Sequence, residues 1–134
     1  LGDYTHIAPF QMIYIGMWLS SPGAHTLLYW VGKGSGAEIA KATSSRELKG
    51  KMEELKGVFE YLRIGLLEYD PGFKNFKVYE SALSSGAEGI GKNICSYIAG
   101  LLSGFLEECT GKRYNVIETQ CLASGADWCE FKVM

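Results

Sequence analysis

The chain has 134 residues and a formal net charge of −2, and 47% of its residues are hydrophobic. This length suits one globular domain with its own core, and the composition excludes a disordered or fibrous chain. Basic residues are scattered among acidic ones, which argues against nucleic-acid binding by this chain alone. The longest apolar run, residues 7–19, is shorter than the roughly 20 residues that a membrane helix needs. We therefore expect a single cytoplasmic domain over residues 1–134, without a membrane span.

Two helices are predicted in the first third of the chain. Hydrophobic residues at helical spacing predict the first, which a break at residues 20–23 ends: Ile7, Phe10, Ile13, Tyr14 and Met17. The second apolar stretch, residues 25–42, contains Gly32, Gly34 and Gly36. It lacks the spacing and the Lys-Ser/Thr ending of a phosphate-binding loop. We interpret it as a helix whose glycines permit close packing.

A third helix and a hairpin are predicted next. Ser44 and Glu47 match a capping box, which predicts that a helix opens there. An apolar stripe follows and predicts a face packed on a sheet: Leu48, Met52, Leu55, Phe59 and Leu62. After Gly65 the hydrophobic period shifts towards two on both sides of an Asp-Pro-Gly turn, which predicts a β-hairpin over residues 66–83. A Gly-rich connection, residues 84–91, comes after it.

The last third predicts a helix over residues 91–110, ended by Gly111, and then two strands, residues 113–123 and 128–134. Because each strand pair is joined by a short turn, the sheet should be largely antiparallel. We expect an α+β fold in which helices pack on one face of this sheet. The final helix and hairpin form its C-terminal unit.

The four cysteines include no Cys-x-x-Cys pair, so geometry must decide which of them can meet. Cys95 and Cys109 are fourteen residues apart on one helix, about 21 Å along its axis, and cannot share a metal ion. The following strand runs back a similar distance, which returns Cys121 to the level of Cys95. The final hairpin places Cys129 opposite Cys121. Three sulfurs therefore converge, and Cys109 is left at the far end.

A carboxylate would complete a tetrahedral ligand set around these sulfurs, and Glu118 is the nearest acid. Three residues along a regular strand put Glu118 and Cys121 on opposite faces, so a bulge or a twist is required. From the residues alone, three states stay open: a metal site, free buried thiols, or a disulfide between Cys121 and Cys129. The only histidines, His6 and His25, lie far away in sequence, so no Cys-His or Ser-His-Asp site is indicated.

The last 45 or so residues resemble the 4-vinyl reductase domain family. The resemblance rests on Cys95, Gly100, Gly104, Glu118, Cys121, Gly125 and Cys129. The family includes archaeal hydrocarbon-binding-type proteins, sensor domains of phenol- and xylene-responsive activators, and an accessory protein of bacteriochlorophyll synthesis. The spacing is similar to the zinc-ligand pattern of the aromatic-sensing members. The resemblance implies a structural zinc bound by Cys95, Glu118, Cys121 and Cys129, a fold similar to that of Golgi-transport tethering subunits, and a homodimer.

The resemblance also implies where a ligand would bind. In the sensor relatives the ligand lies between helices and sheet beside the zinc subdomain, at positions that correspond to Ala99 and Val116. Tyr29, Trp30 and Phe76 are further candidates, although core packing explains each of them equally well. Ala99 and Val116 are small and apolar where the phenol sensors carry polar aromatics, which favours an apolar or aromatic ligand other than phenol.

We therefore predict a domain that binds or senses a small apolar molecule and is stabilised by zinc. We do not expect an enzyme. One alternative is an enzyme or accessory protein in tetrapyrrole vinyl-group reduction, but the sequence has no dinucleotide-binding motif to supply a hydride. The other alternative is a scaffold subunit without a ligand.

Overall fold

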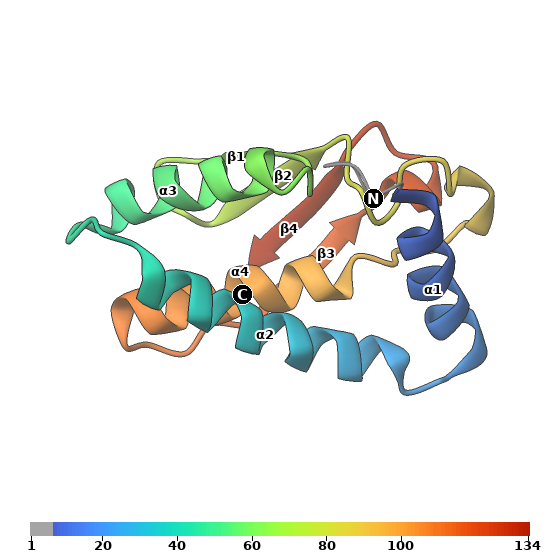
Figure 1. Cartoon of the computed structure of the whole chain (residues 1–134), viewed down its shortest axis with the longest axis horizontal. Helices are drawn as coiled ribbons and strands as arrows, with labels where there is room; N and C mark the ends of the chain where they lie inside the picture. The colour runs from blue at the N-terminus through green and yellow to red at the C-terminus, as the bar shows by residue number, and fades with distance from the viewer. Residues whose placement is uncertain (1–6) are drawn as a thin grey trace, which may run out of the picture.

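A computed structural model describes residues 7–134 (Figure 1). Helices and short strands follow one another in the predicted order of helices, hairpin, helix, hairpin. The elements are α1 (Ile7–Ser20), α2 (Ala24–Ala42), α3 (Leu48–Tyr61), β1 (Leu66–Tyr69), β2 (Asn75–Tyr79), the 3₁₀ turn Glu88–Ile90, α4 (Ser96–Thr110), β3 (Val116–Gln120), the 3₁₀ turn Leu122–Ser124 and β4 (Cys129–Val133). Among the helices of this described part, none combines the length and the hydrophobicity needed to cross a bilayer.

The four strands form one antiparallel sheet in the order β1-β2-β4-β3. The two hairpins join through β2 and β4, where Phe76 lies opposite Phe131. Both of these side chains are fully buried, as are Leu67 and Val78 on the same inner face. The predicted α+β fold is confirmed, with a core between this face and the helices.

Helix α3 packs on the sheet through the predicted stripe, of which Met52, Leu55 and Phe59 are fully buried. Leu62 departs from the prediction, because it lies past the end of the helix and is largely exposed. The predicted capping box is wrong. Ser44 instead donates its backbone N–H and its hydroxyl to Glu54, which lies inside the helix, and α3 begins at Leu48. A carboxylate ten residues away outcompeted the local pattern.

Helices α2 and α4 lie side by side with their backbones in contact (Figure 1). Four glycines form this contact, and a Cβ atom on any of them would clash with a carbonyl oxygen of the other helix. That Cβ would lie only 2.1 Å from the oxygen at Gly32, 2.0 Å at Gly36, 1.9 Å at Gly100 and 2.0 Å at Gly104. The prediction that the glycines of residues 25–42 permit close packing is thus correct for Gly32 and Gly36. Gly34 points into open space.

The contrast between Gly36 and Gly34 tests this contact. Gly36→Ala should lower the free energy of unfolding by roughly 3 kcal/mol or more, because the new methyl group must push two packed helices apart. Gly34→Ala is the matched control and should raise stability by up to about 1 kcal/mol, since alanine favours a helix and meets no neighbour. Urea unfolding followed by circular dichroism measures both. Equal effects of the two substitutions would contradict the close contact.

Candidate metal centre

Four potential ligands from the end of the chain meet in one buried cluster. Cys95 directly precedes α4, Glu118 lies on β3, Cys121 follows β3, and Cys129 begins β4. The three Sγ atoms form a triangle with sides of 3.7, 3.7 and 3.7 Å. One carboxylate oxygen of Glu118 and the three sulfurs all lie within 4.8 Å of one another. The structure thus brings together the four residues that the sequence singled out.

A β-bulge places Glu118 on the same side as Cys121. Glu118 pairs with Phe131 and Gln120 pairs with Glu130, so Thr119 is an extra residue in β3. Such a bulge changes the alternation of side chains by one position. Two residues that are three apart can then face the same side, which resolves the parity problem raised by the sequence.

The geometry of the cluster fits a tetrahedral metal ion. With metal–sulfur bonds of about 2.3 Å, a tetrahedral zinc site has sulfur–sulfur edges of about 3.8 Å. The three observed separations are 3.7 Å. Glu118 Oε2 accepts a hydrogen bond from the backbone N–H of Cys95 at 2.8 Å, whereas its Oε1 is buried without a partner. A buried acceptor without a partner is costly, and coordination by Oε1 would remove that cost.

Two buried serines support the sulfurs from outside the cluster. Ser84 Oγ lies 3.2 Å from Cys129 Sγ, and Ser81 Oγ lies 3.7 Å from Cys95 Sγ. Both serines are fully buried. Hydroxyl donors of this kind stabilise a thiolate and orient it towards a metal. The sequence analysis did not single them out, because they lie in an irregular connection whose path no local pattern specifies.

The cluster cannot ionise fully without a cation. Burial, followed by the charge of Cys121, raises the pKa of Glu118 to about 9. Hydrogen bonding with Cys121 and Cys129, together with burial, raises the pKa of the Cys95 thiol well above its usual value. The pKa of Cys129 falls to about 3 because it accepts hydrogen bonds from Cys121 and Cys95. The metal-free cluster therefore concentrates its negative charge on Cys129, and a bound cation must displace protons from other ligands.

The predicted ligand contacts fall into different places. Tyr29, Ala99 and Val116 line one pocket of about 340 Å³, and Glu118 borders the same pocket, which therefore adjoins the metal cluster. Trp30 is 62% exposed and Phe76 is fully buried in the core, and neither is among the residues that line this pocket. Ser96 also lines it, and its hydroxyl is buried without a hydrogen-bond partner. The structure thus assembles three of the five residues at one pocket.

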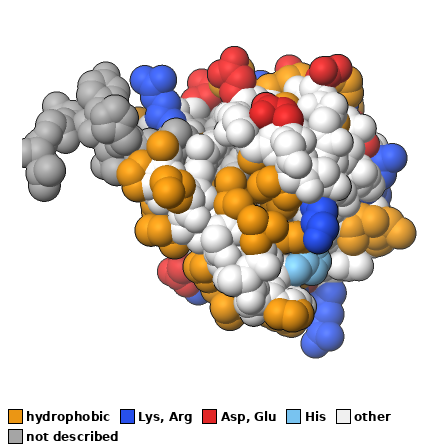
Figure 2. Space-filling model, turned by 90° about the vertical axis from the view of Figure 1, so that its right-hand side faces the viewer, with side chains coloured by type: hydrophobic (Ala, Val, Ile, Leu, Met, Phe, Trp, Pro, Cys, Tyr) orange, Lys and Arg blue, Asp and Glu red, His pale blue; other side chains and the backbone are white. Residues whose placement is uncertain are grey.

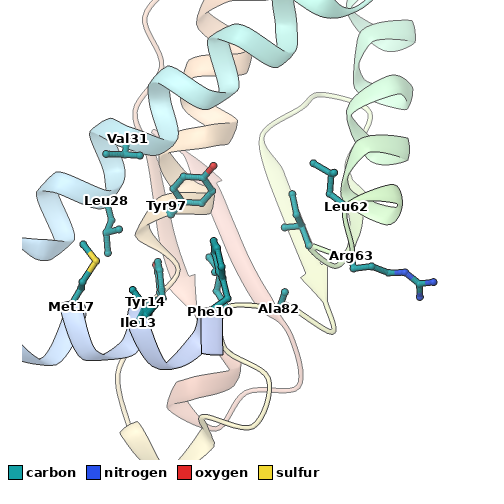
Figure 3. A pocket seen from close by; sticks show the side chains of 12 residues that line it. Phe10, Ile13, Tyr14, Met17, Leu28, Val31, Leu62, Arg63, Ala82 and Tyr97 are labelled. Atoms are coloured by element: carbon teal, nitrogen blue, oxygen red, sulfur yellow. The ribbon is translucent and has the colours of Figure 1, made fainter. Parts of the chain in front are cut away.

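A larger pocket, of about 520 Å³, lies beside α1 (Figure 3). Helix α1 supplies one wall, and the other walls come from α2, the start of α4, the end of α3 and the segment 82–83. Arg63 is the one charged residue among those that line it, and its side chain points away from the pocket in Figure 3. The sequence analysis missed this pocket. The available signal was α1 itself, which has no charged residue and carries apolar side chains on every face.

Cys109 lies near the opposite end of α4 from Cys95 and is a half-buried free thiol. It takes no part in the cluster, as helix geometry predicted.

Comparisons with known proteins agree with this fold. The sequence model of the 4-vinyl reductase domain family matches residues 75–134, which include all four residues of the cluster. Three uncharacterized proteins of Methanocaldococcus jannaschii are similar to the chain. MJ0150 is 27% identical and the match covers 99% of this chain and 78% of that protein. MJ1642 is 29% identical (80% and 62%), and MJ1460 is 35% identical (83% and 67%).

Three solved structures have a similar fold. A vinyl-4-reductase family protein from Methanocaldococcus jannaschii has a TM-score of 0.70 at 22% identity, over 99% of this chain and 83% of that one. The phenol-responsive sensory domain of the transcription activator PoxR, solved with phenol, has a TM-score of 0.74 at 18% identity (96% and 74%). Trafficking protein particle complex subunit 3 from Naegleria fowleri, covalently bound to palmitic acid, has a TM-score of 0.63 at 16% identity (96% and 95%). With its final strands and helix matched by the family's sequence model and its fold shared with a vinyl-4-reductase family protein, this chain belongs to the 4-vinyl reductase domain family.

Proposed function

We propose that this chain is a binding domain for a small apolar molecule, in which a structural zinc fixes the final hairpin. The observation that carries the proposal is the pocket beside α1. Its volume of about 520 Å³ falls in the range of ligand sites, and its lining is apolar or aromatic except for Arg63. Two structural neighbours, the PoxR sensory domain with phenol and the trafficking subunit with palmitic acid, hold molecules that are largely apolar.

Zinc is the metal that best suits the cluster. Three soft thiolates and one carboxylate at tetrahedral spacing match zinc better than magnesium or calcium, which prefer oxygen ligands. Four protein ligands leave no coordination position for a substrate, so the zinc would be structural. The free thiols also suit a reducing compartment, such as the cytoplasm expected from the sequence.

The chemistry of the α1 pocket indicates an uncharged ligand with a large hydrocarbon part. Tyr14 and Leu28 form buried parts of the wall, while Phe10 and Ile13 are exposed at the open side (Figure 3). Such a surface favours ligand binding over a scaffold without a ligand. The pocket lined by Tyr29, Ala99 and Val116 is smaller and more polar, and we keep it as the alternative position for the ligand.

We also propose a homodimer formed through α1 and the neighbouring part of α2. A helix that is apolar on every face is normally buried, yet Met12 and Leu19 of α1 are 74% and 60% exposed. Leu27 and Trp30 of α2 are exposed as well. Figure 2 views the end of the molecule where α1 lies and shows hydrophobic side chains gathered in the middle of that face. A second copy would cover them.

The zinc proposal predicts about one zinc per chain in protein purified without added metal, measured by elemental analysis. Cys121→Ser should remove the metal and lower the melting temperature, because three ligands cannot hold the hairpin. Cys109→Ser is the matched control and should keep the zinc. Because the metal-free form holds protons on Glu118 and Cys95, zinc affinity should fall as the pH is lowered from about 9 to about 6. A wild-type protein that loses its metal without losing stability would contradict a structural zinc.

The α1 pocket can be tested with N-phenyl-1-naphthylamine, an uncharged apolar dye that becomes fluorescent in apolar sites. The wild-type protein should bind the dye, and Val31→Trp should weaken binding at least tenfold, because the indole would fill the pocket. Glu38→Trp adds the same side chain to an exposed position of α2 and should leave binding unchanged. If Thr26→Trp, which fills the smaller pocket, abolishes binding while Val31→Trp does not, the ligand lies beside Glu118 instead.

The dimer proposal predicts twice the mass of one chain in size-exclusion chromatography with light scattering. Met12→Glu should shift the protein towards the monomer, since it buries a charge in the proposed interface. Met134→Glu changes an equally exposed methionine at the other end of the sequence and should leave the dimer intact. A wild-type monomer at micromolar concentration would rule the dimer out.

A further inference from the structure

The α1 pocket and the metal cluster share a wall. This wall is the segment 81–84, which follows β2. Ala82 and Leu83 line the pocket, whereas Ser81 and Ser84, on either side of them, contact the sulfurs of Cys95 and Cys129. Four consecutive residues thus face two different sites.

Helix α1 is bonded to the same wall. The side-chain amide of Gln11 donates to the carbonyl oxygens of Ala82 at 2.6 Å and Ser85 at 2.8 Å. These bonds fix the backbone of the segment that carries Ser84. A displacement of α1 would therefore be transmitted to a hydroxyl that lies 3.2 Å from a metal ligand.

A second link reaches the other side of the cluster. The hydroxyl of Tyr14 donates to the carbonyl oxygen of Ile94, the residue that directly precedes Cys95. Tyr14 also lines the pocket and is 6% exposed. One side chain thus contacts the ligand space and the backbone next to a sulfur ligand.

These links have an energetic consequence. The outer hydrogen bonds of a metal site set the orientation of its ligands, and their loss commonly costs 10- to 100-fold in metal affinity. The open side of the α1 pocket leaves α1 held by few contacts, so a molecule packed between α1 and Leu83 would hold the wall in place. Coupling between two sites acts equally in both directions.

We propose that occupancy of the α1 pocket is coupled to the metal cluster through Ser81–Ser84 and Tyr14, so that a bound apolar molecule slows the release of the metal. This inference rests on the proposed function, because it takes the α1 pocket as the ligand site. Ser81, Ser84, Gln11 and Tyr14 are positioning residues in it, since they act on the metal through its ligands. The expected effect is about tenfold, within the usual range of coupling between sites.

The test measures zinc release from the zinc-loaded protein to excess 4-(2-pyridylazo)resorcinol, followed by absorbance. Saturating N-phenyl-1-naphthylamine should slow release about tenfold in the wild type and should have no effect in Val31→Trp. Tyr14→Phe removes only the hydroxyl bonded to Ile94, so it should keep the fold and bind the dye, yet lose most of the dye's effect on release. Ser84→Ala should speed release even without dye, whereas the exposed control Ser35→Ala should behave as wild type in both measurements.

The outcomes separate this inference from the function on which it rests. If the dye binds the wild type and Val31→Trp blocks it, but zinc release stays unchanged, the coupling is overturned while the binding function stands. Slower release that persists in Tyr14→Phe and Ser84→Ala together would also overturn the proposed route. If the dye does not bind the wild type at all, the α1 pocket fails as a ligand site and the coupling fails with it.

Discussion

The contact between α2 and α4 fixes the positions on which both sites depend. Four glycines bring the two backbones together so closely that a single methyl group would separate them. The start of α4 carries Cys95, and Ala99 lies one turn further on, so this contact sets where the metal cluster and the smaller pocket form. The same contact holds α2 against the sheet layer and thereby places Leu28 and Val31 in the wall of the α1 pocket. Side-chain size at the helix seam is therefore a constraint on binding.

Electrostatics favours a cation in the metal cluster. Three thiols and a carboxyl occupy a volume in which ligand atoms are at most 4.8 Å apart, and burial opposes ionisation of the Glu118 carboxyl and the Cys95 thiol. Without a cation the cluster compensates by sharing protons around Cys129. With a divalent cation the same burial becomes an advantage, because attraction between opposite charges strengthens where water is excluded. The irregular connection around Ser84 would then be tied to α4 and β4 by a single ion.

Much of the cluster was predictable because it follows from fixed distances. The rise per residue of helix and strand brought Cys121 back to Cys95 and excluded Cys109, and strand parity showed that Glu118 needed a bulge. The errors came from long-range contacts. Glu54 competed for the residues that matched a capping box, and Trp30 and Phe76 lie away from the pocket because packing between distant segments decides exposure. The α1 pocket and the buried hydroxyls of Ser81 and Ser84 could not be foreseen, since each is built by segments that are far apart in the sequence.

The position of β4 in the sheet has a consequence for how the chain acquires its structure. It is the last strand in sequence order, yet it lies between β2 and β3 as an inner strand. A ribosome releases the chain from its N-terminal side, so the β1-β2 hairpin is made with one edge unpaired, and the apolar α1 emerges long before α4. Unpaired strand edges and bare apolar helices invite association with other chains. Synthesis thus passes through a vulnerable interval, and it closes only when Cys129–Val133 adds the inner strand and the last sulfur at the same moment.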